Sequence, residues 1–212
     1  MTSQADLIVK VAQSQIGYTE YRNNNSKYGV WYGMNYNDWC CMFVSWCAFT
    51  AQIGTDIVPK YAYVPYMQAF YEKRRRWHVK SSYKPVAGDL VIFGENDHIG
   101  IVEKVVGNTL YSIEGNTSNN GDVSNGEGVF RRTRPLNYWW ITGYCHPAYA
   151  EIPDEGDDMK YYEKIDEMPK DYQLTITKLV SKGIIKGTKN GLHISEDNAR
   201  LLVWLDRAEV FK

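Results

Sequence analysis

The chain has 212 residues, enough for one medium-sized domain and a smaller second one. Hydrophobic residues make up 44% of it and charged residues 23%, which excludes a disordered or collagen-like protein. The 24 Lys and Arg residues nearly balance the 25 Asp and Glu residues, and the net charge is -1. No global field therefore attracts nucleic acid or a charged membrane surface, and we expect neither as a partner.

The first half of the chain has the pattern of helices. Residues 4–16 carry apolar side chains at the spacing of an amphipathic helix, whereas residues 22–38, rich in Asn, Gly and Tyr, predict a long loop. Residues 39–51 are apolar nearly all round, which predicts a buried helix, and Asp38 and the residue before it stand where an N-cap belongs. A further helix is expected over 61–76.

The pattern changes to strands near Pro85. The β-branched or alternating segments are separated by turn residues, among them Gly107 and Asn108, which favour a hairpin between two neighbouring strands. Helices followed by an antiparallel meander predict an α+β domain whose sheet packs against the helix at 39–51. The expected strands cover 90–93, 99–106, 110–113, 129–132 and 139–145.

Three segments are expected along the chain. A larger domain is predicted over 1–150, an acidic linker containing Pro and Gly over 151–159, and a small helical domain over 160–212. About fifty residues fold only marginally alone, so the last domain needs a partner. We favour a homodimer through 160–212, because the expected face is apolar: Leu201, Leu202, Leu205 and Phe211.

Cysteine and histidine usage gives little support to a metal site. The four cysteines are Cys40, Cys41, Cys47 and Cys145, with no CxxC pair, and the four histidines are scattered along the chain. Neither a disulfide framework nor a zinc site is expected from these spacings. We predict no metal and no cofactor.

One cysteine, one histidine and an acid or amide stand at the ends of different elements. Cys40 lies in the first turn of a buried helix, where unpaired N–H groups favour the nucleophilic thiolate. His98 begins an expected strand, and Glu114 and Asn116 end the next one. An imidazole beside the thiol can take and return its proton, and an acid or amide can hold that imidazole in the right tautomer.

These residues also have ordinary structural interpretations. A cysteine in an apolar helix is usually a small buried hydrophobe, and we expect that role for the other three cysteines. A histidine at a strand start is commonly a hydrogen-bonded surface residue, and Glu114 or Asn116 can serve only to form a turn. Composition and spacing therefore suggest a thiol hydrolase without deciding for it.

Five motifs in register strengthen that hypothesis. DWCCMFVSWC (38–47), PVAGDLVIF (85–93), DHIGIVEKV (97–105), YSIEGNTS (111–118) and ITGYCHP (141–147) occur in the order and spacing of one family. Over roughly residues 4–150 the chain resembles the CHAP family, the cysteine, histidine-dependent amidohydrolases/peptidases that cut peptidoglycan. The resemblance implies a papain-like α+β fold.

The resemblance also implies residue roles. The cysteine after the tryptophan, Cys40, corresponds to the nucleophile, His98 to the base, and Glu114 and Asn116 to the orienting acid and amide. The doubled cysteine leaves a small chance that Cys41 is the nucleophile. Some family members bind calcium upstream of the nucleophile, but residues 22–38 offer only one acid, so calcium is not predicted.

The expected substrate is bacterial peptidoglycan. An N-acetylmuramoyl-L-alanine amidase is favoured, with an endopeptidase cutting the stem or cross-bridge peptide as the alternative and an inactive wall-binding protein as the remote one. Trp31, Tyr32 and Trp39 are expected to line a substrate groove. Residues 160–212 resemble the small module behind amidase domains in phage and prophage lysins, which makes the bacterial cell wall the alternative to a second copy of the chain as their partner. With no signal peptide recognisable, we expect synthesis in the cytoplasm and action at the wall after release in phage lysis or from a virion.

Overall fold

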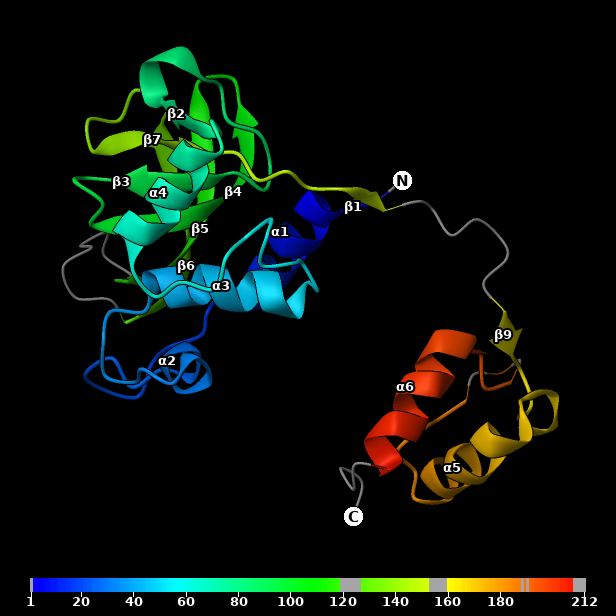
Figure 1. Ribbon diagram of the computed structural model, residues 1–212. Coiled ribbons are helices and arrows are strands. Elements are labelled where there is room, and N and C mark those ends of the chain that lie inside the picture. Colours follow the sequence, from blue (N-terminus) through cyan, green and yellow to red (C-terminus); the bar gives the residue numbers. More distant parts are fainter. Residues whose placement is uncertain (1, 119–126, 153–159, 188, 190, 208–212) are drawn as a thin grey trace. The chain divides into compact units, whose positions relative to one another are not determined.

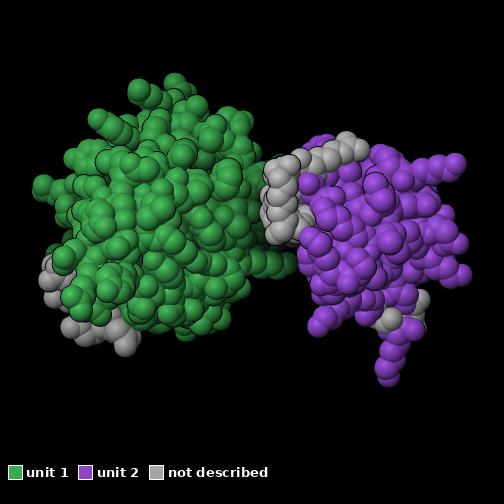
Figure 2. All heavy atoms as spheres, turned by 90° about the horizontal axis from the view of Figure 1, so that it is seen from below, with its two compact units in different colours: residues 1–152 green, residues 153–212 purple. Residues whose placement is uncertain are grey.

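The computed structural model describes residues 2–118, 127–152, 160–187, 189 and 191–207. The chain divides into two compact units, residues 1–152 and 153–212, which Figure 2 colours separately. Each unit is described by itself. Among the described residues, no helix is both long and apolar enough to cross a membrane.

Unit 1 combines helices with one antiparallel sheet, so the predicted α+β class is confirmed (Figure 1). Ser3 caps the first helix, since its hydroxyl accepts from the Asp6 N–H and the Asp6 carboxylate accepts from the Ser3 N–H. The helices are α1 (Gln4–Ser14), α2 (Lys27–Tyr32), α3 (Cys40–Thr50) and α4 (Val64–Lys73).

The sheet has six strands in the order β2-β7-β3-β4-β5-β6, and every neighbouring pair is antiparallel. The expected hairpin is present, because β4 and β5 pair through the turn at Gly107, whose φ of 59° suits glycine. The strands are β2 (Trp77–Val79), β3 (Leu90–Phe93), β4 (His98–Val106), β5 (Thr109–Thr117), β6 (Gly128–Pro135) and β7 (Ile141–Cys145).

The core of unit 1 lies between α3 and the sheet. Most side chains of α3 are buried, as its continuous apolar sequence predicts, and the helix packs on β4 and β5 (Figure 1). From the sheet, Ile99, Ile101 and Ile113 enter the same core. Burial of each such side chain contributes about 1.5–3 kcal/mol, so this contact fixes the start of α3 against the two strands.

Three helix predictions needed correction. The segment 22–38 is not a continuous loop, because α2 forms within it, with Ser26 as its N-cap. The N-cap of α3 is Trp39, with no side-chain cap hydrogen bond, rather than Asp38 or Asn37. The helix expected over 61–76 covers only Val64–Lys73, because Pro65 stands in its first turn and Arg75 adopts a positive φ of 57°.

The expected linker begins with paired backbone. Strand β8 (Glu151–Ile152) pairs with β1 (Thr2–Ser3), so residues 151 and 152 belong to unit 1 rather than to a linker. The acidic composition did not reveal this pairing, because a two-residue strand has no periodicity to detect. The rest of the expected linker, 153–159, lies outside the described residues.

Unit 2 has a small core of its own. Strands β9 (Tyr161–Tyr162) and β10 (Ile194–Ser195) pair, and a 3-10 turn at Ile165–Glu167 precedes α5 (Lys170–Ser181). Helix α6 (Glu196–Arg207) begins after Ser195, whose hydroxyl accepts from the Asn198 N–H. The buried cluster comprises Tyr162, Met168, Ile176, Ile194 and Ala199.

Only part of the apolar face expected for self-association is exposed. Leu201 is half exposed, whereas Leu202 packs against the core of unit 2. Phe211 and the side chain of Leu205 lie outside the described residues. The most exposed large apolar side chains in the described part of the same unit are Leu174 on α5 and Trp204 on α6, which sequence spacing did not single out.

Candidate active site

The fold brings the start of α3 and the hairpin β4–β5 together. Cys40 is the first residue of α3, His98 is the first residue of β4, and Glu114 lies near the end of β5. Space for the Glu114 side chain comes from Gly100, because a Cβ added at that position would lie 2.5 Å from Glu114 Cγ. A glycine two residues after His98 is therefore needed to make room for the Glu114 side chain.

His98 and Glu114 form a buried hydrogen-bonded pair. Their Nε2 and Oε2 atoms are 3.1 Å apart, and the two residues are 3% and 0% exposed. Contact with a carboxylate on Nε2 leaves the other ring nitrogen, Nδ1, for a second partner. The parallel ring of Trp140, 6.1 Å away between centroids, covers the imidazole.

Four donors surround the Glu114 carboxylate. Oε1 accepts from the Ser112 hydroxyl and from Nη1 of Arg134, while Oε2 accepts from Nη2 of Arg134 at 3.1 Å and contacts His98. Burial alone would raise the pKa of Glu114, but the hydrogen bonds and charges of His98 and Arg134 outweigh it and lower the pKa from 4.5 to about 2. Glu114 is therefore a carboxylate at neutral pH.

Cys40 is the second partner of His98. Burial opposes a charge on the imidazole, yet hydrogen bonds with the Cys40 thiol and the Glu114 carboxylate raise the pKa of His98 from 6.5 to about 9. The Cys40 side chain lies at the N-terminus of α3, where free N–H groups and the helix dipole favour an anion. A thiolate and an imidazolium stabilise each other in this arrangement.

The other cysteines lack such partners. Cys41, Cys47 and Cys145 are fully buried, and burial raises the pKa of each thiol well above 9.0. Nearby thiols or carboxylates add to the effect at Cys41 and Cys145. A thiolate is therefore unfavourable at all three positions.

Asn116 takes a different position from Glu114. It lies at a bulge in the pairing of β5 with β6, with a positive φ of 54°. Its Nδ2 donates to Oδ1 of Asp38, just before α3, at 3.3 Å, and its buried Oδ1 has no hydrogen-bond partner in the described part of the chain. Of the two orienting candidates, Glu114 alone is hydrogen-bonded to His98 among the residues described.

The three residues expected to line a groove differ in their burial. Trp39 is fully buried, its ring stacks on Tyr28 at 5.0 Å, and its Nε1 donates to Glu20. The expectation that Trp39 contacts a substrate was therefore wrong, because the fold uses this ring to anchor the start of α3. Trp31 and Tyr32 on α2 are half-buried beneath the ammonium group of Lys60.

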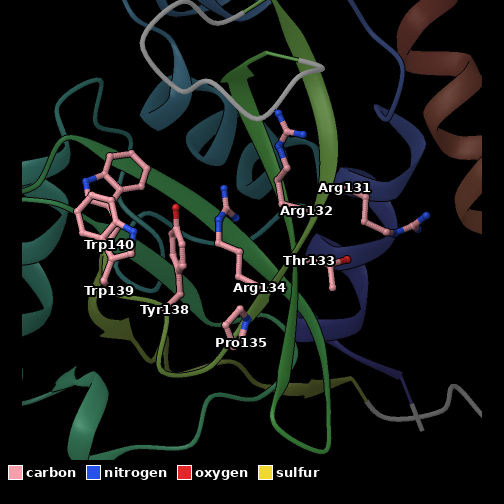
Figure 3. Close-up of a pocket in the computed structure, with 8 residues that line it drawn as sticks. All are labelled: Arg131, Arg132, Thr133, Arg134, Pro135, Tyr138, Trp139 and Trp140. Atoms are coloured by element: carbon pink, nitrogen blue, oxygen red, sulfur yellow. The ribbon is translucent and has the colours of Figure 1, made fainter.

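Sequence reasoning missed Arg134 and Trp140. Both belong to the segment 131–140, which lines a pocket of about 590 Å³ (Figure 3). A signal was present in the sequence, because three arginines fall within four residues of a strand that otherwise pairs with an apolar sheet. Period-2 alternation sends Arg132 and Arg134 to one face of β6.

Metal ligands are not grouped at this site. In the parts of the chain that the structure describes, no three His, Cys, Asp or Glu side chains cluster as metal ligands would. The chemistry available to these residues is proton transfer between a thiol and an imidazole, with a carboxylate on the opposite ring nitrogen.

Comparison with known proteins finds one family model and several solved structures that this chain resembles. Residues 31–116 match the model of the CHAP domain family. Among solved structures, the chain is similar to Ly7917, with 16% identity and a TM-score of 0.42, over 69% of this chain and 63% of that one. A structure of Ly7917 with the hydrolyzing product of MDP gives 17% identity and a TM-score of 0.40, over 68% and 62%. The chain thus spans less than two thirds of those chains, and no curated protein matches it.

The family match covers the whole candidate site. It begins in α2 and ends at Asn116, so it includes the start of α3 and both strands of the hairpin. Cys40, His98 and Glu114 all lie within it. Residues 31–116 of the chain are therefore similar to the CHAP domain family.

Proposed function

We propose that unit 1 hydrolyses an amide bond of bacterial peptidoglycan with Cys40 as nucleophile. The observation that carries the proposal is the buried imidazole of His98, hydrogen-bonded through Nε2 to the Glu114 carboxylate at 3.1 Å, with the Cys40 thiol at the start of α3 close enough to raise the pKa of the imidazole. Nucleophile, base and orienting group are arranged in this order in thiol and serine hydrolases. The CHAP domain match supports a peptidoglycan amide as the substrate.

The reaction follows from the proton positions. The thiol of Cys40 passes its proton to His98, and the thiolate sulfur bonds to the carbonyl carbon of the amide. The C–N bond then breaks as the imidazolium protonates the leaving amine, which leaves a thioester on Cys40. Water gives a proton to His98 and attacks the thioester, the C–S bond breaks, and the carboxylic acid and the thiol are released.

Glu114 acts through His98. Its carboxylate holds the Nε2–H of the ring, so Nδ1 faces the thiol in the tautomer that accepts a proton. It also stabilises the imidazolium formed during the reaction. We assign no contact with the substrate to Glu114, because it is completely buried.

The start of α3 is suited to the negative charge on the carbonyl oxygen. The N–H groups in the first turn of a helix have no intrahelical acceptor, and the first bond of α3 is donated by Phe43 to the Trp39 carbonyl at 2.8 Å. The N–H groups of Cys40 and the next residues are therefore available as oxyanion donors. Asp38 and Asn116 border this turn.

We favour cleavage between N-acetylmuramic acid and L-alanine. Mass spectrometry of digested peptidoglycan tests this directly, because an amidase leaves a free lactyl carboxylate and an L-alanine amine, whereas an endopeptidase leaves new termini within the peptides. Cys40→Ala is expected to abolish digestion, and Cys47→Ala, a change at a buried cysteine of the same helix, to retain it. Digestion by Cys40→Ala would end the proposed role of this thiol.

We further propose that the enzyme acts at the cell wall after release from the cytoplasm, as a phage lysin does. The resemblance of residues 160–212 to a lysin module supports this assignment. Unit 2 then serves as a self-association or wall-attachment module. Its most exposed apolar side chains, Leu174 and Trp204, are candidates for either contact.

A further inference from the structure

The pocket along residues 131–140 is bordered by two arginines with different environments (Figure 3). Arg132, Arg134 and Tyr138 extend toward the same side of β6 and the turn after it, whereas Arg131 extends away from them. Arg131 binds Glu103 instead, through Nε at 2.6 Å and Nη2 at 2.7 Å. The cations that face the pocket are therefore Arg132 and Arg134.

Arg134 is already neutralised. Both of its terminal nitrogens bond the Glu114 carboxylate, and its side chain is only 11% exposed. It has little capacity left to bind another anion. Its position nevertheless connects the pocket to the candidate active site, because the same carboxylate contacts His98.

Arg132 is less completely paired. Its Nη2 donates to the Thr117 hydroxyl at 3.2 Å, and its buried Nε has no hydrogen-bond partner. No carboxylate bonds it among the residues that the structure describes. Burial lowers the pKa of Arg132, in agreement with an incompletely compensated charge. A guanidinium presents donors in a planar fork that matches a carboxylate.

Aromatic rings form the other side of the pocket. Trp139 is 77% exposed, and it is the most exposed tryptophan among the residues that the structure describes. Trp140 follows it and lies parallel to the His98 ring. Trp140 therefore lies between the pocket and the reacting imidazole. A substrate held in the pocket would have its scissile amide next to His98.

We propose that this pocket binds a carboxylate of the peptide part of the substrate, with Arg132 as its ligand and the Trp139 ring against the adjoining carbon chain. The inference rests on the proposed function, since a peptidoglycan stem peptide contains free carboxylates close to its amide bonds. The Arg132 guanidinium supplies the charge-assisted hydrogen bonds and the exposed indole supplies apolar contact. The pocket thereby selects substrates whose peptide retains its negative charge.

Binding of matched peptides tests the proposal on the full chain. The probes are the stem tripeptide L-Ala–γ-D-Glu–L-Lys with free carboxylates and the same tripeptide with the carboxylates converted to amides, titrated by calorimetry into the Cys40→Ala protein. A charged hydrogen bond of ordinary strength predicts about 10- to 100-fold tighter binding of the free acid. Equal affinities for the two peptides would overturn the proposal. This comparison needs no substitution in the pocket.

Variants then locate the preference. Arg132→Gln in the same background is expected to remove it, and Arg132→Lys to retain part of it. The matched control is Lys104→Gln, which removes one exposed positive charge outside the pocket lining. A preference that persists in a folded Arg132→Gln protein, or that disappears in Lys104→Gln, would contradict the assignment. Circular dichroism establishes that each variant is folded.

The outcome is distinguishable from failure of the proposed function. If the chain does not digest peptidoglycan but its acid preference depends on Arg132, the pocket assignment stands and the hydrolase proposal fails. If digestion occurs with equal use of free and amidated substrates, the hydrolase proposal stands and the pocket assignment fails. If the hydrolase proposal and the pocket assignment are both correct, amidation of the substrate's carboxylates is expected to raise KM with little change in kcat.

Discussion

Replacement of Glu114 by Gln perturbs both the chemistry and the stability of the site. Glu114 accepts two donors on each oxygen: Ser112 and Arg134 on Oε1, and His98 and Arg134 on Oε2. An amide has only one oxygen, so in Glu114→Gln one pair of donors must face an NH2 group. The variant is therefore similar in shape but cannot reproduce the hydrogen bonds.

The loss of activity in Glu114→Gln can be approximated from the raised pKa of His98. A pKa of about 9 in place of 6.5 corresponds to about 3 kcal/mol of added stabilisation of the His98 imidazolium, shared between Cys40 and Glu114. Loss of the part that Glu114 supplies is about ten- to a hundredfold in rate. A wrong tautomer adds to it, because a glutamine NH2 can donate to Nε2. We expect kcat/KM to fall about 10²- to 10⁴-fold.

The loss of stability has a different origin. Arg134 is buried and loses the charge that neutralises it, and breaking such a pair costs about 3–5 kcal/mol. This is a large part of the roughly 5–15 kcal/mol that stabilises a typical domain. The double variant Glu114→Gln/Arg134→Met removes the orphaned cation, and we expect it to recover most of the unfolding free energy without recovering activity.

Two measurements separate these effects. Urea unfolding gives the stability of wild type, Glu114→Gln and the double variant, and turbidity loss of purified cell walls gives their activity. The alkaline limb of the kcat/KM profile should also move to lower pH in Glu114→Gln, since His98 loses a neighbour that raises its pKa. Near-wild-type turnover with an unmoved alkaline limb would refute the role of Glu114.

The remaining predictions concern the nucleophile, pH and unit 2. Cys41→Ala should leave wall digestion within a few-fold of wild type while His98→Ala abolishes it, and loss of digestion in Cys41→Ala alone, with folding retained, would contradict our choice of nucleophile. The folded-state pKa of His98 is raised, so its stabilisation is present below pH 6.5 and lost as pH rises through about 9. The folded-state pKa of Glu114 is lowered, so its stabilisation is present above pH 4.5 and lost as pH falls toward about 2. The difference in unfolding free energy between wild type and Glu114→Gln, measured by urea titration, should therefore narrow at both low and high pH. A protein of residues 1–152, which keeps the pairing of β1 with β8, should be folded and monomeric, whereas light scattering should show the full chain as a dimer. If both are monomers and only the full chain sediments with cell walls, unit 2 is a wall-binding module.

The sequence alone predicted most of the longer elements of unit 1 in their correct order. Alternating or β-branched segments bounded by turn residues predicted five strands of the large sheet to within a few residues, and an uninterrupted apolar stretch predicted the buried α3. Periodicity is a local property, so it can be detected without knowledge of distant contacts. Short paired segments such as β1 and β8 contain too few residues for a period, and the sequence did not indicate them.

Tertiary structure alone distinguished the side chains within the site. The sequence offered Glu114 and Asn116 equally, but a bulge with positive φ at Asn116 moves this residue off the alternation of β5 and toward Asp38, so the carboxylate is the one on His98. Arg134 contacts Glu114 from the neighbouring strand β6. Trp39 is buried by packing against Tyr28. Strand register, bulges and ring packing depend on contacts between distant segments, which the periodicity of one segment does not encode.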